Sequence, residues 1–228
     1  MIEYLKEVFW PYMQMLLPLL FEGFKVTIYV SIIAFILAVI LGVALAVIQL
    51  LDNKIINKVI GVCVAYCRAT PLLIQLFIFY YGLPMIFEFM KSIPKVPALI
   101  VVLAINSAAY ISEIIRGAID SVDSGQYEAS VAFGMSMSEA MGRIILPQAA
   151  VAAVPSIVNT CLDIVKLSSL GMTIGIQDVM GQAQLQAAIS YRSLETYLVA
   201  AVFYWILMII VGYIQRIVEK RFNAAYQR

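Results

Sequence analysis

The segment GQYEASVAFGMSMSEAMGRIILPQA, residues 125–149, is a polar and charged stretch set between long apolar ones. Inside it, Glu-Ala-Ser at 128–130 is followed after three residues by Gly134. Nine further residues lead to Ile-Ile-Leu-Pro at 144–147. An apolar chain that keeps such a segment outside the bilayer usually needs it for docking another molecule. We therefore expect residues 121–147 to form a binding loop.

The composition predicts an integral membrane protein with one domain. The 228 residues are 63% hydrophobic and 13% charged, whereas soluble domains are about 45–50% apolar and about 25% charged. This length leaves little room for a separate soluble domain. The net charge of +1 argues against a nucleic-acid partner, because nothing in the sequence resembles a basic patch.

The sequence offers little for catalysis or for metal and cofactor binding. It contains no histidine, the commonest metal ligand and general base, and its three cysteines lie in apolar stretches. It also lacks G-x-x-x-x-G-K-[ST], the motif that holds nucleotide phosphates in P-loop proteins. We expect no enzyme activity, no metal site and no cofactor in this chain.

Five apolar stretches are long enough to cross a bilayer as helices of about 20 residues. They are residues 26–48, 71–87, 96–119, 147–170 and 196–215. The region from Ile55 to Phe87 counts as one span because a straight helix of that length would be ~50 Å long, against a ~30 Å hydrocarbon core. Pro71 marks a break, and of the two parts residues 71–87 are the one that can just cross.

The ends of the chain are assigned from local composition. Glu3 and Glu7 stand where a signal peptide would carry basic residues, so we expect none. Residues 1–23 contain Pro11 and Pro18 and are expected to form an interfacial segment. A membrane domain at 24–220 and a cytoplasmic tail at 221–228 would follow it.

The distribution of lysine and arginine orients the spans. With the N-terminus outside, nine basic residues are cytoplasmic and five are outside, as the positive-inside rule requires. This orientation places residues 121–147 in the cytoplasm.

Two short helices are predicted inside this loop. Good N-cap residues precede the first, namely Asp120, Ser121, Asp123 and Ser124. That helix runs from about 126 to 133, and Gly134 tolerates the left-handed conformation of a helix end. Ser136 and Glu139 have the spacing of a capping box, and Pro147 should stop the second helix and open the fourth span. The local chemistry alone would equally suit an amphipathic connector on the bilayer surface.

The full spacing resembles the EAA loop of ATP-binding-cassette (ABC) importer permeases, with Ser130 in place of the usual second alanine. Two further segments, RATPLLIQLF at 68–77 and AYISEIIRG at 109–117, resemble the polar amino acid branch of that family. The resemblance extends over almost the whole chain from Phe24 onward. One departure lies in the fourth span, where Leu167 replaces the usual acidic or amide residue and an acid appears one turn earlier, at Asp163.

The resemblance implies an all-α membrane protein with about five spans, a type I importer permease fold and a cytoplasmic two-helix coupling loop. It implies a bacterial inner membrane, an amino acid substrate, a second permease copy or paralogue, two ATP-binding subunits and an extracellular solute-binding protein. The ATPase is expected to dock through Gln126, Glu128, Ala129, Gly134, Met135 and Ser136. Its closure would drag the attached spans and switch access to the substrate. Glu128 could equally be a solvated helix residue.

Ionisable residues inside spans are costly and therefore mark candidate functional sites. Glu113 and Arg116 lie three residues apart in the third span, which suits an anchoring ion pair or a gate. Asp163 and Lys166 have the same spacing in the fourth span. They form either a self-neutralising pair or the two poles of a site for a zwitterion.

The break at Pro71 is the expected complement to that pair. The first N–H groups of the helix that follows can take a carboxylate, with Gln75 as a further donor or as an interhelical hydrogen bond. The predicted substrate residues are Thr70, Leu72, Leu73, Gln75, Asn159, Asp163 and Lys166. An acid and a base together suit a ligand with both charges, such as cystine.

A self-contained secondary transporter or small channel for a polar solute is the alternative function. It would use an ion gradient rather than an ATPase, and it would show more internal repeat symmetry than this sequence has.

Overall fold

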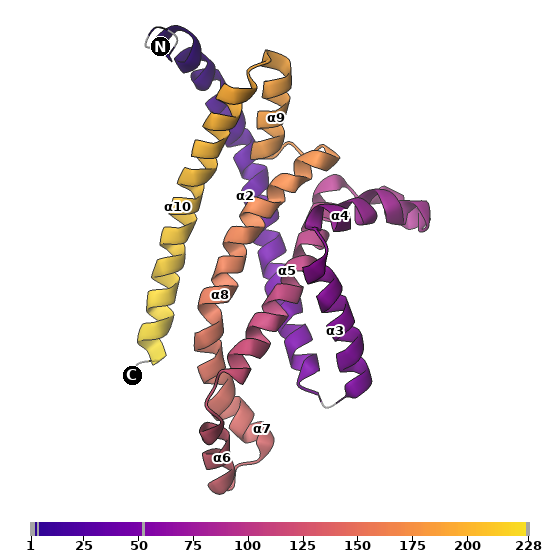
Figure 1. The fold of residues 1–228 in the computed structure, drawn as a ribbon, viewed down its shortest axis with the longest axis vertical. Coiled ribbons are helices and arrows are strands. Elements are labelled where there is room, and N and C mark those ends of the chain that lie inside the picture. Colours follow the sequence, from indigo (N-terminus) through magenta and orange to yellow (C-terminus); the bar gives the residue numbers. More distant parts are fainter. Residues whose placement is uncertain (1–2, 4, 52, 227–228) are drawn as a thin grey trace.

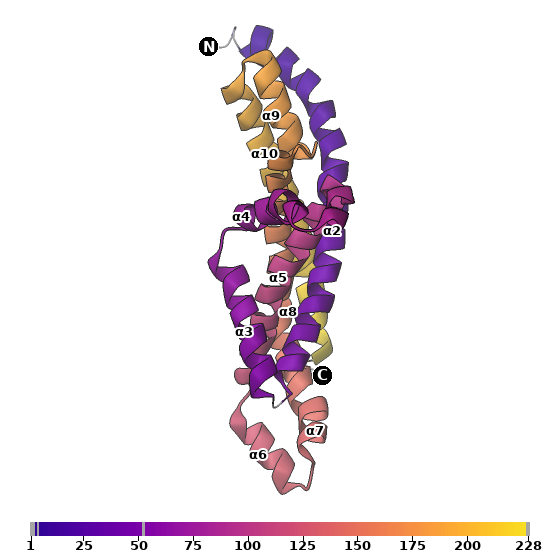
Figure 2. The ribbon, with the colours of Figure 1, turned by 90° about the vertical axis from the view of Figure 1, so that its right-hand side faces the viewer.

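The computed structural model describes residues 3, 5–51 and 53–226, and its regular elements there are all helices (Figures 1 and 2). In that part of the chain, four helices are long and apolar enough to span a membrane, and a bent helix pair gives a fifth. The prediction of an all-α membrane protein with about five spans is therefore confirmed. The main helices are α2 (Trp10–Gln49), α3 (Lys54–Ala69), α4 (Leu72–Phe77), α5 (Lys95–Asp120), α6 (Ser124–Ala132), α7 (Met137–Ala140), α8 (Leu146–Leu167), α9 (Val179–Ser190) and α10 (Ser193–Tyr226).

The core forms where α2 and α8 pack against α5, the most buried of the spanning helices. From Gly23 onward, the face that α2 buries consists, apart from Val30, of small residues three or four positions apart: Gly23, Thr27, Ser31, Ala34, Ala38, Gly42 and Ala46. A Cβ on Gly42 would lie 2.6 Å from Cγ2 of Ile111 on α5. Small side chains at this spacing let two helix backbones approach closely, which is how helices associate in a membrane.

Helix α2 is continuous through Pro18 and begins at Trp10. Pro11 lies in its first turn, where a missing N–H costs nothing. Neither proline therefore interrupts the helix in this region. A 40-residue helix is ~60 Å long, about twice the hydrocarbon core, so α2 extends beyond it. That residues 1–23 lie at the interface stays a prediction, and residues 1, 2 and 4 are outside the described part.

The break at Pro71 is confirmed, and the helices on its two sides run in different directions; that residues 71–87 are the crossing part stays a prediction. Thr70 is extended (φ −105°, ψ 142°), as the residue before a proline prefers. The helix pair 54–69 and 72–85 bends there by 108°. Helix α3 packs against α2 and α5, whereas the segment after Pro71 turns aside (Figures 1 and 2). The lengths of the helices on the two sides of Pro71 could be estimated from the sequence, but the direction in which each one runs could not.

Pro147 does not stop the second loop helix, contrary to prediction. Helix α7 passes through one π-helical turn, η5 (Met141–Ile145), directly into α8. Pro147 lies in the first turn of α8, where it is compatible with a helix that arrives from the preceding residues through a widened turn. The loop is thus joined rigidly to the fourth span.

The segment between α8 and α10 contains α9, which was not predicted. Its N-cap is Asp178, whose side chain is buried and accepts a hydrogen bond from the Gly181 N–H at 2.8 Å. A Cβ on Gly23 would lie 2.5 Å from the Asp178 carbonyl oxygen, so α2 and the start of α9 touch backbone to backbone. Helix α10 continues to Tyr226, so most of the predicted tail is helical, and residues 227 and 228 lie outside the described part.

The buried carboxyl of Asp178 should make the stability of the folded protein depend on pH. It lies outside the spans, and burial raises the pKa of its carboxyl from 3.8 to about 7 against the opposing hydrogen bonds from Gly181 and Met180. Among the described residues its Oδ2 has no hydrogen-bond partner. The folded state therefore favours the neutral acid, and this contribution is complete below about pH 4 and is lost as the pH rises through about 7. The loss is at most about 4 kcal/mol.

We expect the melting temperature in detergent to fall between about pH 5.5 and about pH 8 in the wild type. Asp178→Asn keeps an oxygen for the Gly181 N–H but cannot ionise, so its profile should be flat. Asp123→Asn changes the N-cap of α6, which is exposed and accepts from Gly125 N–H at 2.7 Å, and should leave the wild-type slope. Equal slopes for wild type and Asp178→Asn would contradict the assignment.

Candidate functional site

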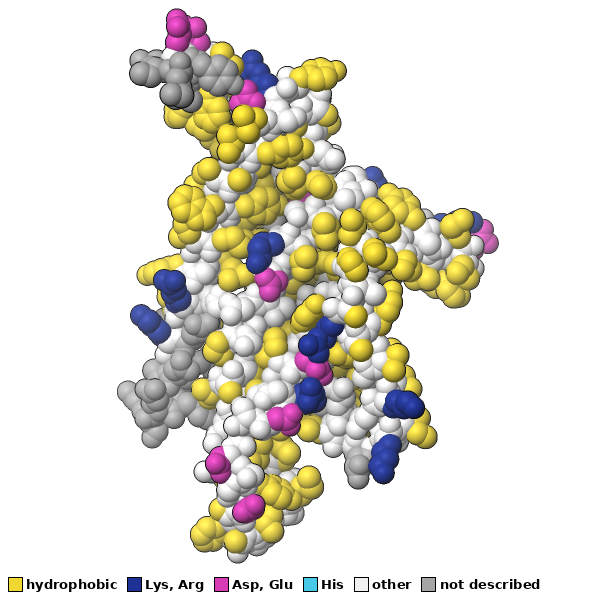
Figure 3. All heavy atoms as spheres, in the orientation of Figure 1, with side chains coloured by type: hydrophobic (Ala, Val, Ile, Leu, Met, Phe, Trp, Pro, Cys, Tyr) yellow, Lys and Arg dark blue, Asp and Glu magenta, His cyan; other side chains and the backbone are white. Residues whose placement is uncertain are grey.

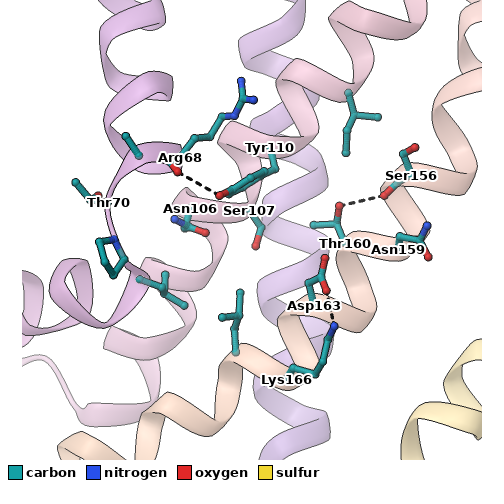
Figure 4. A pocket seen from close by; sticks show the side chains of 15 residues that line it. Arg68, Thr70, Asn106, Ser107, Tyr110, Ser156, Asn159, Thr160, Asp163 and Lys166 are labelled. Atoms are coloured by element: carbon teal, nitrogen blue, oxygen red, sulfur yellow. Dashed lines mark hydrogen bonds and ion pairs between the residues drawn. The ribbon is translucent and has the colours of Figure 1, made fainter.

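A polar pocket of about 840 Å³ lies between the α3–α4 break and α5 on one side and α8 on the other (Figure 4). Ligand pockets for small molecules are commonly ~300–1,000 Å³. Its polar lining residues are Arg68, Thr70, Asn106, Ser107, Tyr110, Ser156, Asn159, Thr160, Asp163 and Lys166. The pocket is therefore large enough, and polar enough, for one amino acid.

The acid and the base predicted in the fourth span meet in this pocket. Lys166 Nζ lies 2.7 Å from Asp163 Oδ1, and both side chains are more than half exposed. An exposed pair of this kind contributes little stability, so its charges can be exchanged for those of a ligand at small cost. Asn159 lines the same wall, and its Oδ1 accepts a hydrogen bond from Gln215 of α10 at 2.8 Å.

Gln75 does not line the pocket. It lies behind the opposite wall and supports that wall through hydrogen bonds. Its buried Nε2 donates to Cys67 O (2.9 Å), Thr70 O (3.1 Å) and Thr70 Oγ1 (2.8 Å). Asn106 Nδ2 donates to Cys67 O (2.9 Å) and to Gln75 Oε1 (3.1 Å). We call this pair of amides, Gln75 and Asn106, the elbow clamp. It satisfies backbone carbonyls that the end of α3 would otherwise leave unpaired inside the membrane.

Glu113 and Arg116 form the predicted pair, with Arg116 Nη2 at 3.0 Å from Glu113 Oε2. Each also has a partner that the sequence did not suggest. Arg68 Nη1 lies 2.6 Å from Glu113 Oε2, and Arg116 Nη1 lies 3.2 Å from Asp120 Oδ2. Glu113 therefore ties the end of α3 to α5.

The loop at residues 121–147 has the local structure that its sequence predicts. Gly134 has φ +82°, and the Met135 N–H bonds to Ser130 O while the Gly134 N–H bonds to Val131 O. This is the Schellman motif that ends a helix at a glycine. Ser136 and Glu139 form the capping box in both directions. The α6–α7 pair projects from the end of the molecule opposite to α9 (Figure 1).

Ser130 and the exposed side chains divide the loop into an inner and an outer face. Ser130 is buried, and its hydroxyl donates to Gln126 O at 2.6 Å, so only a small residue fits there. The predicted docking residues Gln126, Glu128, Ala129, Gly134 and Ser136 are exposed, and Met135 is half-buried. Phe133, which was not predicted, is 89% exposed, and Met137 is 65% exposed. Apolar side chains this exposed at a loop tip indicate a contact surface.

Comparison with known proteins decides the family. Residues 38–224 match the family described as "Binding-protein-dependent transport system inner membrane component". The chain belongs to this family.

Two relatives and one solved structure carry the same result. The probable amino-acid ABC transporter permease PatM of Vibrio harveyi is 44% identical over 71% of this chain and 72% of its own. The probable amino-acid permease YxeN of Bacillus subtilis is 35% identical over 96% and 97%. A crystal structure of an amino acid ABC transporter with histidines has TM-score 0.83 and 33% identity, covering 90% of this chain and 94% of its own.

The chain is thus the permease subunit of an amino acid ABC importer and a multi-pass inner-membrane protein. Its ATPase is a separate subunit, and a self-contained transporter or channel is excluded as the main function. We call the loop at 121–147, with its Glu-Ala-Ser triplet, the coupling loop; that the ATPase docks on it stays a prediction.

The structure separates the predicted substrate residues into two groups. Thr70, Leu72, Asn159, Asp163 and Lys166 line the pocket, whereas Leu73 and Gln75 do not. Helix α4 is regular for only six residues before η2 (Ile78–Gly82), so it presents a weak helix terminus to an anion. Sequence reasoning missed the polar pocket residues Arg68, Asn106, Ser107, Tyr110, Ser156 and Thr160. For Asn106 and Ser107 the missed signal was an adjacent pair of polar residues in an otherwise apolar span.

Proposed function

We propose that this permease imports a zwitterionic polar amino acid, and that Asp163 and Lys166 take its opposite charges. The observation that carries this is the open 2.7 Å pair in the wall of an 840 Å³ polar pocket. A substrate with a carboxylate and an ammonium group can replace both partners without leaving either charge unpaired. A purely cationic substrate would place a second positive charge beside Lys166 and offer it no negative group.

Cystine is the substrate that we expect to fit best, because it carries both charges at each end. One relative is named as an L-cystine permease, but others are named for arginine and glutamine. The relatives therefore support the amino acid class, and the charge pair supports the choice within it.

The proposed assembly contains two permease chains, identical or paralogous, two ATP-binding subunits and an extracellular solute-binding protein. The N-terminus lies outside and the coupling loop lies in the cytoplasm, as the distribution of basic residues requires. The chain itself holds no cofactor. ATP-driven closure of the ATPase pulls on α6 and α7. The turn η5 transmits that movement to α8, because it is continuous with α7 on one side and with α8 on the other.

ATP-dependent uptake into liposomes by the complete complex tests the pocket. With L-cystine, L-arginine and L-glutamine as probes, we expect Asp163→Asn and Lys166→Met each to raise the KM of the transported amino acid at least about tenfold, the loss of roughly 1.4 kcal/mol of binding. The matched control is the pair Glu22 and Lys25, which has the same spacing and distance and is also exposed. Lys25→Met should leave KM unchanged. Unchanged KM in both pocket variants would refute the site.

A further inference from the structure

Four charged side chains form a continuous series of ion pairs along one face of the permease. Arg68 bonds to Glu113 (2.6 Å), Glu113 to Arg116 (3.0 Å) and Arg116 to Asp120 (3.2 Å). We call these four residues the ion-pair series. Blue and magenta side chains alternate down the middle of the molecule toward the loop end in Figure 3. The two positive and two negative charges cancel.

One end of the ion-pair series is part of the substrate pocket. Arg68 lines the pocket and lies in the last turn of α3, just before the break (Figure 4). Its guanidinium lies over the Tyr110 ring at 5.8 Å, and the Tyr110 hydroxyl donates to the Arg68 carbonyl at 3.4 Å. Arg68 is therefore held on both its backbone and its side chain beside the space that a substrate would occupy.

The other end of the ion-pair series is at the coupling loop. Asp120 is the last residue of α5, and Asp123, three residues later, is the N-cap of α6. Whatever changes the contacts of Arg116 and Asp120 therefore acts at the point where α5 passes into the coupling loop.

The residues of the ion-pair series can exchange partners easily. Glu113 is a single carboxylate shared by two arginines, and Arg68, Arg116 and Asp120 are each more than 40% exposed. Ion pairs with this exposure are weak and easily replaced. An arginine presents five N–H donors in a planar fork that suits a carboxylate, and Arg68 Nη1 uses only one edge of that fork for Glu113. A second carboxylate in the pocket would compete directly with Glu113.

We propose that the substrate carboxylate taken by Lys166 also binds Arg68 on the other side of the pocket, and that Arg68 reports it to the ATPase through the ion-pair series. The substrate carboxylate draws Arg68 away from Glu113. Glu113 then binds Arg116 alone, which weakens the contact of Arg116 with Asp120 and frees the start of the coupling loop. This inference rests on the proposed import of a zwitterionic amino acid and adds how loading of the pocket is signalled.

The competing role of Arg68 and Glu113 is structural: an ion pair that holds α3 against α5. A charge swap distinguishes this structural role from the sensing role. Arg68→Glu/Glu113→Arg preserves an ion pair between the helices. If the pair is structural, the charge-swap variant should therefore recover both stability and function. A sensor would recover stability only, because the glutamate introduced at position 68 repels a substrate carboxylate.

The experiment uses the reconstituted complex of permease, ATPase and binding protein. ATPase rates are measured with and without the transported member of the L-cystine, L-arginine and L-glutamine panel, together with uptake KM and melting temperature. The variants are Arg68→Gln, Arg68→Lys, Glu113→Gln and the charge swap. Lys91→Gln, which breaks an exposed pair with Glu88 at 3.4 Å, is the matched control.

We expect Arg68→Gln and Glu113→Gln to assemble normally but to lose at least fivefold in stimulation by substrate, and Arg68→Gln alone to raise KM. Arg68→Lys, which keeps the charge without the fork, should be intermediate. The charge swap should restore the melting temperature but not the stimulation. Full stimulation in the charge swap or in Arg68→Gln would overturn the proposal. If instead the wild-type complex takes up none of the three amino acids with ATP, the proposed function has failed rather than the sensor.

Discussion

Gly134→Val is expected to abolish ATP-dependent uptake and co-purification of the ATPase with the permease. Gly134 has φ +82°, where a side chain with Cβ costs roughly 1–2 kcal/mol and a β-branched residue is a severe outlier. The valine backbone would leave the left-handed region, break the Schellman hydrogen bonds and re-aim α6 relative to α7. A Cβ at this position would meet no heavy atom of the described chain within 4 Å. The melting temperature of the isolated permease should therefore stay close to that of the wild type.

Two controls separate backbone conformation from bulk. Gly134→Asn adds a side chain but tolerates the left-handed region, so it should retain a substantial part of the uptake. Gly142→Ala alters an exposed glycine of η5 that does not have positive φ and should behave as wild type. If Gly134→Val still binds the ATPase at wild-type stoichiometry and transports, the coupling loop is not the docking element. Equal failure of Asn and Val would instead assign the effect to direct contact with the ATPase.

The coupling loop was predictable because its determinants are local. Gly134, Ser136 and Glu139 act within a few residues of one another, and their hydrogen bonds follow from chain geometry alone. The exposed Phe133 was missed because exposure depends on how α6 lies against η5, which no short motif encodes.

The fold beyond the count of spans depends on contacts distant in sequence. The direction of α3 and of the segment after Pro71 is set by packing on α2 and α5, not by the proline. Helix α9 begins where Asp178 meets Gly23, 155 positions away along the chain. The row of small residues on α2 was readable in the sequence and would have pointed to the α5 contact.

The pocket was predicted only in part, because in the third span the prediction considered the ionisable Glu113 and Arg116 alone. It passed over Asn106, whose amide is buried in that span. In a membrane, a buried amide needs partners as much as a charge does. Asn106 is therefore as informative as Asp163, although it serves the wall of the pocket through the elbow clamp.

Asn106→Leu is expected to cause the largest loss of transport of any single change in the pocket wall. It removes the donor to Gln75 Oε1 and one donor to Cys67 O while roughly preserving volume. An acceptor left buried without its donor costs ~1–3 kcal/mol. Gln75 would then turn away from Thr70 and release the bend between α3 and α4, which displaces Arg68 and Thr70 from the pocket. An energy of this size corresponds to a roughly tenfold to hundredfold reduction in uptake at limiting substrate.

A double-variant cycle tests whether the elbow clamp acts as a unit. Ser107→Ala removes an oxygen from the adjacent position of the same wall and should have a small effect. If Gln75 and Asn106 hold the bend together, Asn106→Leu already releases it, and Gln75→Leu/Asn106→Leu should lose little more than the single variant. Independent hydrogen bonds would instead give additive losses in melting temperature and uptake. Additivity would mean that each amide stabilises the pocket wall independently of the other, so that the elbow clamp is not a unit.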